Sequence, residues 1–273
     1  MARSLGYSRQ YLYKLRKQAC EEKLVKQQVK ALVDGQRKLL PRLGTRKLYF
    51  RLRPALAGMG IKLGRGRLFA WMREFGLLLR PGRRYVQTTN SKHFLRKYPN
   101  LVRGLQPTAP EQVWVSDITY LGTRQGSCYL SLVTDAFSRK IVGYAVAANM
   151  EAVSMGKALE MALGQRETAA QTIHHSDRGL QYCSRHYVGL ATGNGMRMSM
   201  TQGSDPYENA LAERMNRTLK EEFGLGRVLA DLQQAELLAR QAVELYNHHR
   251  PHLSLQMRAP EQVHQQQIKI PVC

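Results

Sequence analysis

The sequence has few cysteines, no cysteine pair and no long apolar run. Its four cysteines lie far apart, at positions 20, 128, 183 and 273, and none belongs to a Cys-x-x-Cys motif. The N-terminus carries no apolar signal segment, so the sequence predicts a reducing cytoplasm as its compartment. No apolar run approaches the roughly 18 residues that a transmembrane helix needs, and no membrane partner is expected.

Acidic residues are scarce in the first part of the chain. Residues 1–112 hold 26 Lys and Arg against 5 Asp and Glu, a net charge of +21, whereas residues 113–273 hold 16 against 15, a net charge of +1. A solvated basic face that aids solubility is one explanation, but such an asymmetry more commonly indicates binding to a polyanion. The sequence therefore predicts a nucleic-acid partner whose affinity depends on salt.

Two apolar patterns at helical spacing lie in this basic part, on either side of a Gly-Met-Gly break at 58–60. Their apolar positions are Leu48, Leu52, Ala55 and Leu56, then Leu68, Phe69, Met72 and Phe75. The second pattern is accompanied by Arg65, Arg67 and Arg73, which we expect to contact DNA. Residues 1–80 are thus predicted to form a small all-α, helix-turn-helix-like DNA-binding module. The alternative is a helical pair that packs without contacting bases.

Residues 81–112 are polar, basic and interrupted by prolines, which predicts an interdomain linker. Beyond them, strands are predicted at 113–121, 127–134, 140–147, 171–175 and 196–200, and helices at 151–164, 184–192, about 206–224 and 230–247. Three consecutive strands followed by alternating helices and strands indicate an α/β fold with a mixed sheet. We predict a catalytic domain at 113–225 and a C-terminal helical extension at 226–273.

Three acids occupy positions where a short acidic side chain is hard to explain by packing. Asp117 interrupts an apolar, β-branched strand, where an unpaired carboxylate costs several kcal/mol. Asp177 leaves the strand at 171–175, and strand ends are where α/β sheets place their chemistry. Glu213 flanks the apolar stripe of a helix that Pro206 opens. A shared function would explain all three.

Carboxylates that converge on one point repel each other unless hard cations such as Mg²⁺ compensate their charge. Two ions about 3.5 to 4 Å apart would activate an attacking water or hydroxyl and stabilise the leaving oxygen of a phosphodiester. The sequence therefore predicts in-line phosphoryl transfer, with Asp117, Asp177 and Glu213 as catalytic residues and metal ligands. Mn²⁺ suits such a site as well.

Several long motifs follow one another between roughly residues 40 and 265. They are Trp-Val-Ser-Asp-Ile-Thr-Tyr at 114–120, Asp-Ala-Phe-Ser-Arg-Lys-Ile-Val-Gly-Tyr at 135–144, His-His-Ser-Asp-Arg-Gly-Leu-Gln-Tyr at 174–182, Glu-Asn-Ala-Leu-Ala-Glu-Arg at 208–214, Tyr-Asn-His-His-Arg-Pro-His at 246–252 and Ala-Pro at 259–260. Together they closely resemble bacterial insertion-sequence transposases of the OrfB type, which are integrase-like DDE transposases. The resemblance implies a ribonuclease H-like catalytic core with a three-carboxylate site. Asp117, Asp177 and Glu213 match that site, with 59 and 35 residues between them.

The resemblance extends to residues around the third acid. The family's basic residue seven positions after the glutamate matches Lys220, two helical turns from Glu213 on a similar face, where an ammonium is expected to hold a DNA phosphate. The chain departs from the family at Glu208, often Asp, and at Arg214, often Ser. Glu retains the charge of Asp, so we expect activity to survive. Arg250 is expected to contact DNA.

The family's activity implies a transposase that cleaves DNA and then transfers the freed 3′-hydroxyl. Its partners would be double-stranded DNA at the insertion-sequence ends and at the target, and further copies of itself in a homo-oligomer. Residues 3–17 resemble the end of another helical module. Because the family often joins an upstream reading frame to this one, the protein of that frame is expected as a partner or fusion. The expected location of the chain is the bacterial cytoplasm, in association with the nucleoid. Two alternatives remain: a catalytically silent DNA-binding regulator or assembly subunit, and cleavage of RNA in hybrids, which the basic module disfavours.

Other chemically suggestive residues have simpler explanations. Asp135 ends a strand and precedes a turn, and turn chemistry accounts for it. His174 and His175 lie at a strand end, where local packing or hydrogen bonding is more common than metal binding. Pro251 interrupts any helix that would align the histidines at 248, 249 and 252. No cysteine pair lies nearby, so zinc is not expected.

Overall fold

The computed structural model describes residues 8–79, 94–168, 171–202 and 209–268. For residues 267 and 268 it describes the backbone alone. The predicted linker as far as residue 93, and also Pro206 and Glu208, lie outside the described residues. The chain divides into two compact units, Met1–Pro81 and Gly82–Cys273, which are described one at a time.

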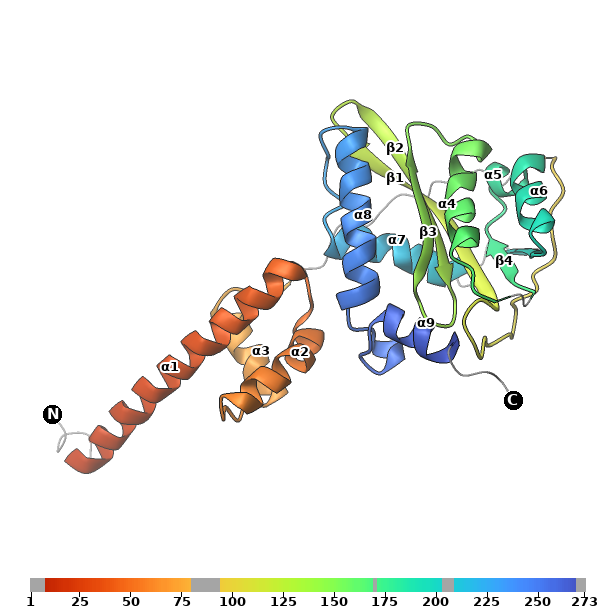
Figure 1. Cartoon of the computed structure of the whole chain (residues 1–273). Coiled ribbons are helices and arrows are strands. Elements are labelled where there is room, and N and C mark those ends of the chain that lie inside the picture. The colour runs from red at the N-terminus through yellow and green to blue at the C-terminus, as the bar shows by residue number, and fades with distance from the viewer. Residues whose placement is uncertain (1–7, 80–93, 169–170, 203–208, 269–273) are drawn as a thin grey trace. The chain divides into compact units, whose positions relative to one another are not determined.

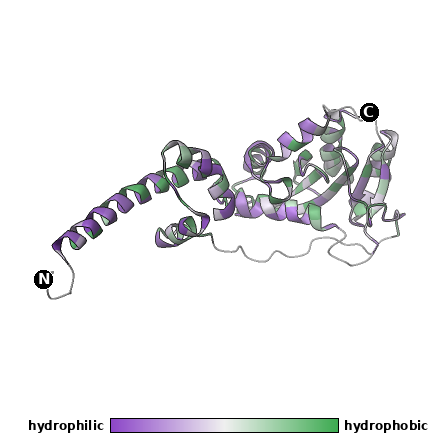
Figure 2. Cartoon of the chain, turned by 90° about the horizontal axis from the view of Figure 1, so that it is seen from below, coloured by the Kyte–Doolittle hydropathy of each residue, from purple (hydrophilic) through white to green (hydrophobic). Residues whose placement is uncertain are grey.

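The first unit consists of helices α1 (Arg9–Leu39), α2 (Thr45–Gly58) and α3 (Arg65–Glu74), as Figure 1 shows. The hydroxyl of Ser8 caps α1 by accepting a hydrogen bond from the backbone N–H of Tyr11. Purple and green alternate along α1 in Figure 2, but Val29 and Val33 are its only fully buried residues among those described. The sequence did not predict this 31-residue helix as one element, because so little of it carries a periodic apolar stripe.

Two residues after the last residue of α2, and likewise of α3, lies a glycine in the left-handed conformation, Gly60 at φ 67° and Gly76 at φ 67°. In each case the glycine N–H and the next N–H bond back to the last turn, as in a Schellman motif. The Gly-Met-Gly break predicted at 58–60 is therefore a helix stop.

The core of the first unit corrects part of the predicted apolar stripe on α3. Leu68 and Met72 are fully buried as expected, but Phe69 is 40% exposed. Trp71 is buried in its place at 4% exposure. Phe69 and Trp71 flank the stripe of Leu68 and Met72 on opposite sides of the helix, and the core of the unit extends to the Trp71 side.

The second unit is built on a five-stranded mixed sheet in the order β3-β2-β1-β4-β5. Its strands are β1 (Val113–Thr123), β2 (Gly126–Asp135), β3 (Ile141–Ala147), β4 (Ile173–Ser176) and β5 (Arg197–Met200). The first three pair antiparallel, whereas β4 runs parallel to both β1 and β5. The predicted mixed sheet is confirmed.

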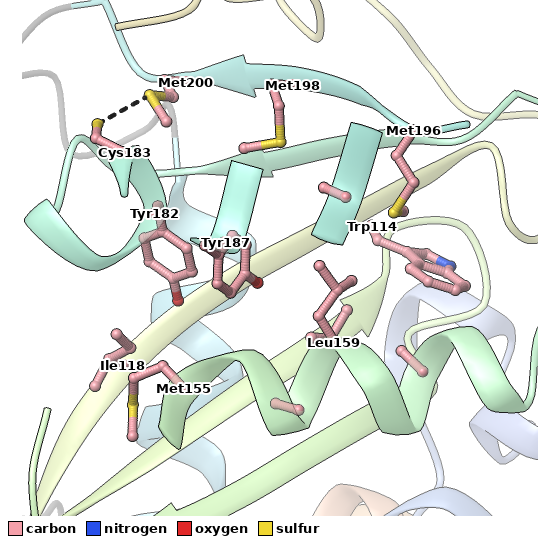
Figure 3. Close-up of a cluster of buried hydrophobic side chains, with 14 of the residues drawn as sticks. Trp114, Ile118, Met155, Leu159, Tyr182, Cys183, Tyr187, Met196, Met198 and Met200 are labelled. Carbon is pink, nitrogen blue, oxygen red and sulfur yellow. Dashed lines mark hydrogen bonds between the residues drawn. The ribbon is translucent and has the colours of Figure 1, made fainter. Parts of the chain in front are cut away.

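Helices cover both faces of this sheet (Figure 1). On one face lie α4 (Ala152–Gly164), α5 (Leu180–Cys183) and α6 (Arg185–Gly193), and on the other α7 (Ala210–Glu222) and α8 (Leu232–His249). The core under α4 to α6 is shown in Figure 3, where Trp114 and Ile118 of β1 face Met155, Leu159, Tyr182 and Tyr187. Alternate residues of β1 therefore point into the opposite layer, under α7.

Most elements of the second unit start and end within a few residues of their predicted bounds. Two short elements were not predicted, α5 and the 3₁₀ turn at Leu253–Leu255, because they are too short to carry a periodic signal. Helix α9 (Pro260–Ile268) lies in the predicted C-terminal helical extension, for which no bounds of individual helices were predicted beyond 247. No helix in the described part of the chain combines the length and apolarity needed to cross a bilayer.

Candidate active site

Asp117 and Asp177 lie where the parallel pairing of β1 with β4 ends, Asp117 within β1 and Asp177 directly after β4. The pairing of β1 with β4 ends at Ser116 opposite Ser176, and each aspartate is the next residue. Side chains at matching positions of parallel strands point to the same side of the sheet. The register therefore places the two aspartates side by side along the sheet, where β4 ends.

The electrostatics of Asp117 reflect this crowding. The partly buried carboxyl has a pKa raised to about 7, first by burial and then by the charge of Asp177, with a smaller contribution from Glu213. Two hydrogen bonds act in the opposite direction and favour the ionised form: one from the side-chain amide of Asn216, at 2.9 Å, and one from the backbone N–H of Ile118. The net effect is a pKa well above the ordinary value, because burial and the two neighbouring acids outweigh these hydrogen bonds.

Asp177 is held in the turn that follows β4. Its Oδ1 accepts a hydrogen bond from the backbone N–H of Gly179 at 3.0 Å, a local turn typical of aspartate. The turn leads directly into α5. This hydrogen bond fixes the orientation of the Asp177 carboxylate at the edge of the sheet.

Glu213 lies in the first turn of α7 and is exposed. Its pKa is raised by partial burial of the carboxyl and by the charge of Asp177. The charges of the three predicted acids thus act on one another, across β1, the turn after β4 and α7.

Two successive turns of α7 form hydrogen bonds with alternate residues of β1. Asn216 donates to Asp117, and one turn later the ammonium of Lys220 donates to the hydroxyl of Thr119 at 2.5 Å. Asp117 and Thr119 are two apart on the strand and share a face, and Glu213, Asn216 and Lys220 recur at helical spacing. This match explains why Lys220 is half-buried against the sheet. Burial lowers the pKa of its ammonium, and the charge of Asp117 opposes that shift.

The donor set fits a hard divalent cation, because it consists of carboxylates whose anionic forms are disfavoured by burial and mutual repulsion. Within the residues that the structure describes, no three His, Cys, Asp or Glu side chains come close enough to form a ready metal site. Repulsion among uncompensated carboxylates opposes close approach.

Asp135, His174 and His175 form local hydrogen bonds, as the sequence predicted. Asp135 accepts hydrogen bonds from the backbone N–H groups of Phe137 and Ser138, and so organises the turn after β2. His174 is fully buried, with Nε2 bonded to the hydroxyls of Ser116 and Tyr187. His175 bonds in the same local way, through Nδ1 to Ser199 of the next strand at 2.9 Å.

The four arginines expected to contact DNA differ in their surroundings. Arg65 and Arg73 are exposed on the first unit. Arg67 is exposed but lies 3.2 Å from the carboxylate of Glu22 and stacks over the ring of Trp71.

Arg250, unlike the other three arginines, is buried and paired within the protein. Its guanidinium is buried at 6% residue exposure and forms a two-pronged ion pair with Glu222, at 2.8 and 2.6 Å. It also packs over the ring of Tyr246. The buried fork joins the ends of α7 and α8 and does not present its charge to a ligand in solvent.

Sequence reasoning missed three polar residues beside the acids: Asn216, Asn209 and Arg178. Asn209 donates from Nδ2 to the backbone carbonyl of Ser116, and Arg178 donates to the carbonyls of Thr201 and Gln202. Their proximity to Asp117, Asp177 and Glu213 in the sequence was the available signal, but polar residues near an acid are too common to single out.

Comparison with known proteins places these features in a family context. Two family models, each described as an integrase core domain, match residues 107–206 and 194–260. The chain is 39% identical to the insertion element IS600 uncharacterized 31 kDa protein of Shigella sonnei, over 75% of this chain and 76% of that protein. It is 31% identical to the transposase for insertion sequence element IS904 of Lactococcus lactis, over 76% and 79% of the two chains.

A solved structure supports the fold. A chain of the simian T-cell lymphotropic virus intasome, in complex with PP2A regulatory subunit B56 gamma, matches with a TM-score of 0.52 and 16% sequence identity. The match covers 84% of this chain and 73% of that chain. The mixed α/β core is therefore of the ribonuclease H-like type found in integrase catalytic domains.

Proposed function

Because the chain belongs to the insertion-sequence transposases that carry an integrase core domain, we propose that it cleaves and joins DNA strands through Asp117, Asp177 and Glu213. The observation that supports this most strongly is the coupling of the three acids across β1, β4 and α7. Burial and the charges of neighbouring acids raise the pKa of Asp117 and of Glu213, and perturbed acids that act on one another are typical of catalytic sites.

The three carboxylates would hold Mg²⁺, with Mn²⁺ as a substitute. Two bound ions would supply positive charge that compensates the carboxylates and stabilises the attacking and leaving oxygens of a phosphodiester. An attacking water gives strand cleavage, and an attacking 3′-hydroxyl gives strand transfer.

The chain's own residues would orient these groups. The amide of Asn216 fixes one oxygen of Asp117 and leaves the other directed by the N–H of Ile118. The N–H of Gly179 fixes Asp177 in the same manner. Lys220 places an ammonium one helical turn beyond Asn216, where we propose that it attracts a DNA phosphate next to the reacting strand.

We further propose that the first unit binds double-stranded DNA at the ends of the element. Exposed Arg65 and Arg73 on α3, within the strongly basic first 112 residues, support this role. We also propose that the protein brings two DNA ends together as a homo-oligomer, with the upstream-frame protein as a fusion or partner.

The direct test is Mg²⁺-dependent cleavage and joining of a labelled duplex that carries the terminal repeats of the element. Wild-type protein should give both products, whereas Asp177→Asn and Glu213→Gln should give neither and should keep their affinity for the duplex. The loss should exceed about 100-fold, because each variant removes a metal ligand.

A fully active Glu213→Gln protein would refute the assignment of the third acid. If wild type and Asp177→Asn both bind the duplex and neither reacts, the chain is a DNA-binding assembly subunit. Addition of the upstream-frame protein would then show whether that protein supplies the missing part.

A further inference from the structure

Residues next to the two aspartates form hydrogen bonds with Thr201 and Gln202, directly after β5, and with Asn209, directly before α7. At the β5 end, the guanidinium of Arg178 donates from Nε to the carbonyl of Thr201 and from Nη2 to that of Gln202. At the α7 end, the amide of Asn209 donates to the carbonyl of Ser116 at 3.2 Å. Arg178 directly follows Asp177, and Ser116 directly precedes Asp117.

The contact of Arg178 with the end of β5 depends on the planar, forked shape of the guanidinium. Two nitrogens of one planar guanidinium reach two successive carbonyls, which a single ammonium cannot do with the same geometry. The backbone N–H of Thr201 also donates to the carbonyl of Ser176, so the parallel pairing of β4 with β5 continues to this point. The chain therefore leaves β5 in a direction set by the residue that follows Asp177.

At the start of α7, Asn209 bonds to β1 instead of capping the helix. Asn209 is the N-cap residue of α7, a position where asparagine usually accepts a hydrogen bond from the helix's own N–H groups. Here it makes no such bond, and its buried Oδ1 has no hydrogen-bond partner in the described part of the chain. The amide is directed to β1 instead, which ties the first turn of α7 to the strand that carries Asp117.

Glu213 lies four residues after Asn209, about one turn into a rigid helix. Its position relative to Asp117 and Asp177 therefore depends on where α7 begins. We propose that Arg178 and Asn209 are positioning residues that set the place of Glu213 in the three-carboxylate site. This inference rests on the proposed function, since it concerns the same site.

The test measures binding of Mn²⁺ by electron paramagnetic resonance, which needs no DNA and no turnover. Arg178→Met should weaken Mn²⁺ binding by about tenfold, in the range typical of residues that orient metal ligands. Arg178→Lys should remain several-fold weaker than wild type, because charge without the fork cannot hold both carbonyls. Arg197→Met removes an exposed arginine from β5 and should leave the affinity unchanged.

A double-mutant cycle with Glu213→Gln separates positioning from general damage to the fold. If Arg178 acts through Glu213, Arg178→Met should weaken Mn²⁺ binding by less than about twofold when Glu213 is already Gln. Asn209→Ala should show the same dependence on Glu213. Equal effects in both backgrounds, or full recovery with Arg178→Lys, would overturn the inference.

The outcomes also separate this inference from the proposed function. If wild type fails to bind Mn²⁺, or if Asp177→Asn binds it equally well, the three-carboxylate site itself is wrong. If wild type binds Mn²⁺, Asp177→Asn does not, and the Arg178 and Asn209 variants behave as wild type, only the positioning role is wrong.

Discussion

His174 is a fully buried imidazole whose charge state matters for stability. Burial lowers its pKa from 6.5 to about 3, and the neighbouring His175 adds to this shift. The folded protein therefore keeps the ring neutral in a pH range where the unfolded chain would protonate it. Its contribution to stability is present above about pH 6.5 and is lost as the pH falls towards 3.

We predict that replacing His174 with Gln makes the unfolding free energy less dependent on pH between these values. One titrating group contributes a slope of at most about 1.4 kcal/mol per pH unit. Urea unfolding at a series of pH values measures it, with His248→Gln, an exposed histidine of α8, as the control. Equal slopes for wild type and His174→Gln would contradict the prediction.

At the scale of elements, β3 and α4 approach so closely that only glycine fits between them. A Cβ on Gly143 would lie 2.0 Å from the backbone carbonyl oxygen of Ala158 and 3.0 Å from the Cβ of Ala162. Because the obstacle is backbone, α4 itself would have to move away from the sheet.

We predict that Gly143→Ala lowers the unfolding free energy by about 1 to 3 kcal/mol, as overpacking commonly does. Gly164→Ala in α4 is the matched control, since an added Cβ there meets nothing within 4 Å. Chemical denaturation should find the control unchanged or slightly more stable. A Gly143→Ala protein as stable as wild type would mean that α4 shifts without cost.

The ion pair between Arg250 and Glu222 connects α7 to α8. Arg250→Met should lower the unfolding free energy by about 2 to 3 kcal/mol, because the replacement leaves the partly buried Glu222 carboxylate without its partner. DNA affinity should change less than twofold, since the guanidinium is not exposed to a ligand.

Denaturation and duplex-binding titrations on the same variant test both statements. The double variant Arg250→Met with Glu222→Gln should recover part of the lost stability, because it also removes the negative charge that Arg250 compensates in the wild type. Weaker DNA binding with unchanged stability would instead support the direct contact between Arg250 and DNA that the sequence predicted.

At the scale of the whole molecule, the separation of charge along the chain predicts how DNA binding responds to salt. If Arg65 and Arg73 each contact a phosphate, replacing both with Gln should reduce the slope of log K against log salt by about 2. Fluorescence anisotropy with a labelled duplex at several salt concentrations measures the slope. Arg67 is left intact because it already pairs with Glu22.

The control removes the same charge from exposed positions of the second unit, with Arg227→Gln and Arg240→Gln. That variant should keep a slope close to that of wild type. An equal loss of slope in both variants would mean that DNA responds to total charge and not to α3.

Local patterns were sufficient to predict much of the second unit from sequence. Apolar stretches located the five strands of this sheet, and three consecutive strands followed by alternating helices and strands indicated that the sheet is mixed. The parallel pairing of β1 with β4 is a finding of the structure. Asp117 stood out because a carboxylate in an apolar strand is costly. Long α1 and short α5 were missed because neither carries enough periodic apolar surface to be recognised.

The sequence by itself determined what depends on neighbouring residues: the elements, the concentration of positive charge before residue 113, and three acids in unusual local settings. Only the tertiary structure decided which side chains meet. Asn216 bonds to Asp117 from 99 positions away, and Arg250 is buried by Glu222 from 28 positions away. The physical reason is that hydrogen bonds and burial depend on the packing of whole elements, and a single position in the sequence carries no record of the partner that packing brings to it.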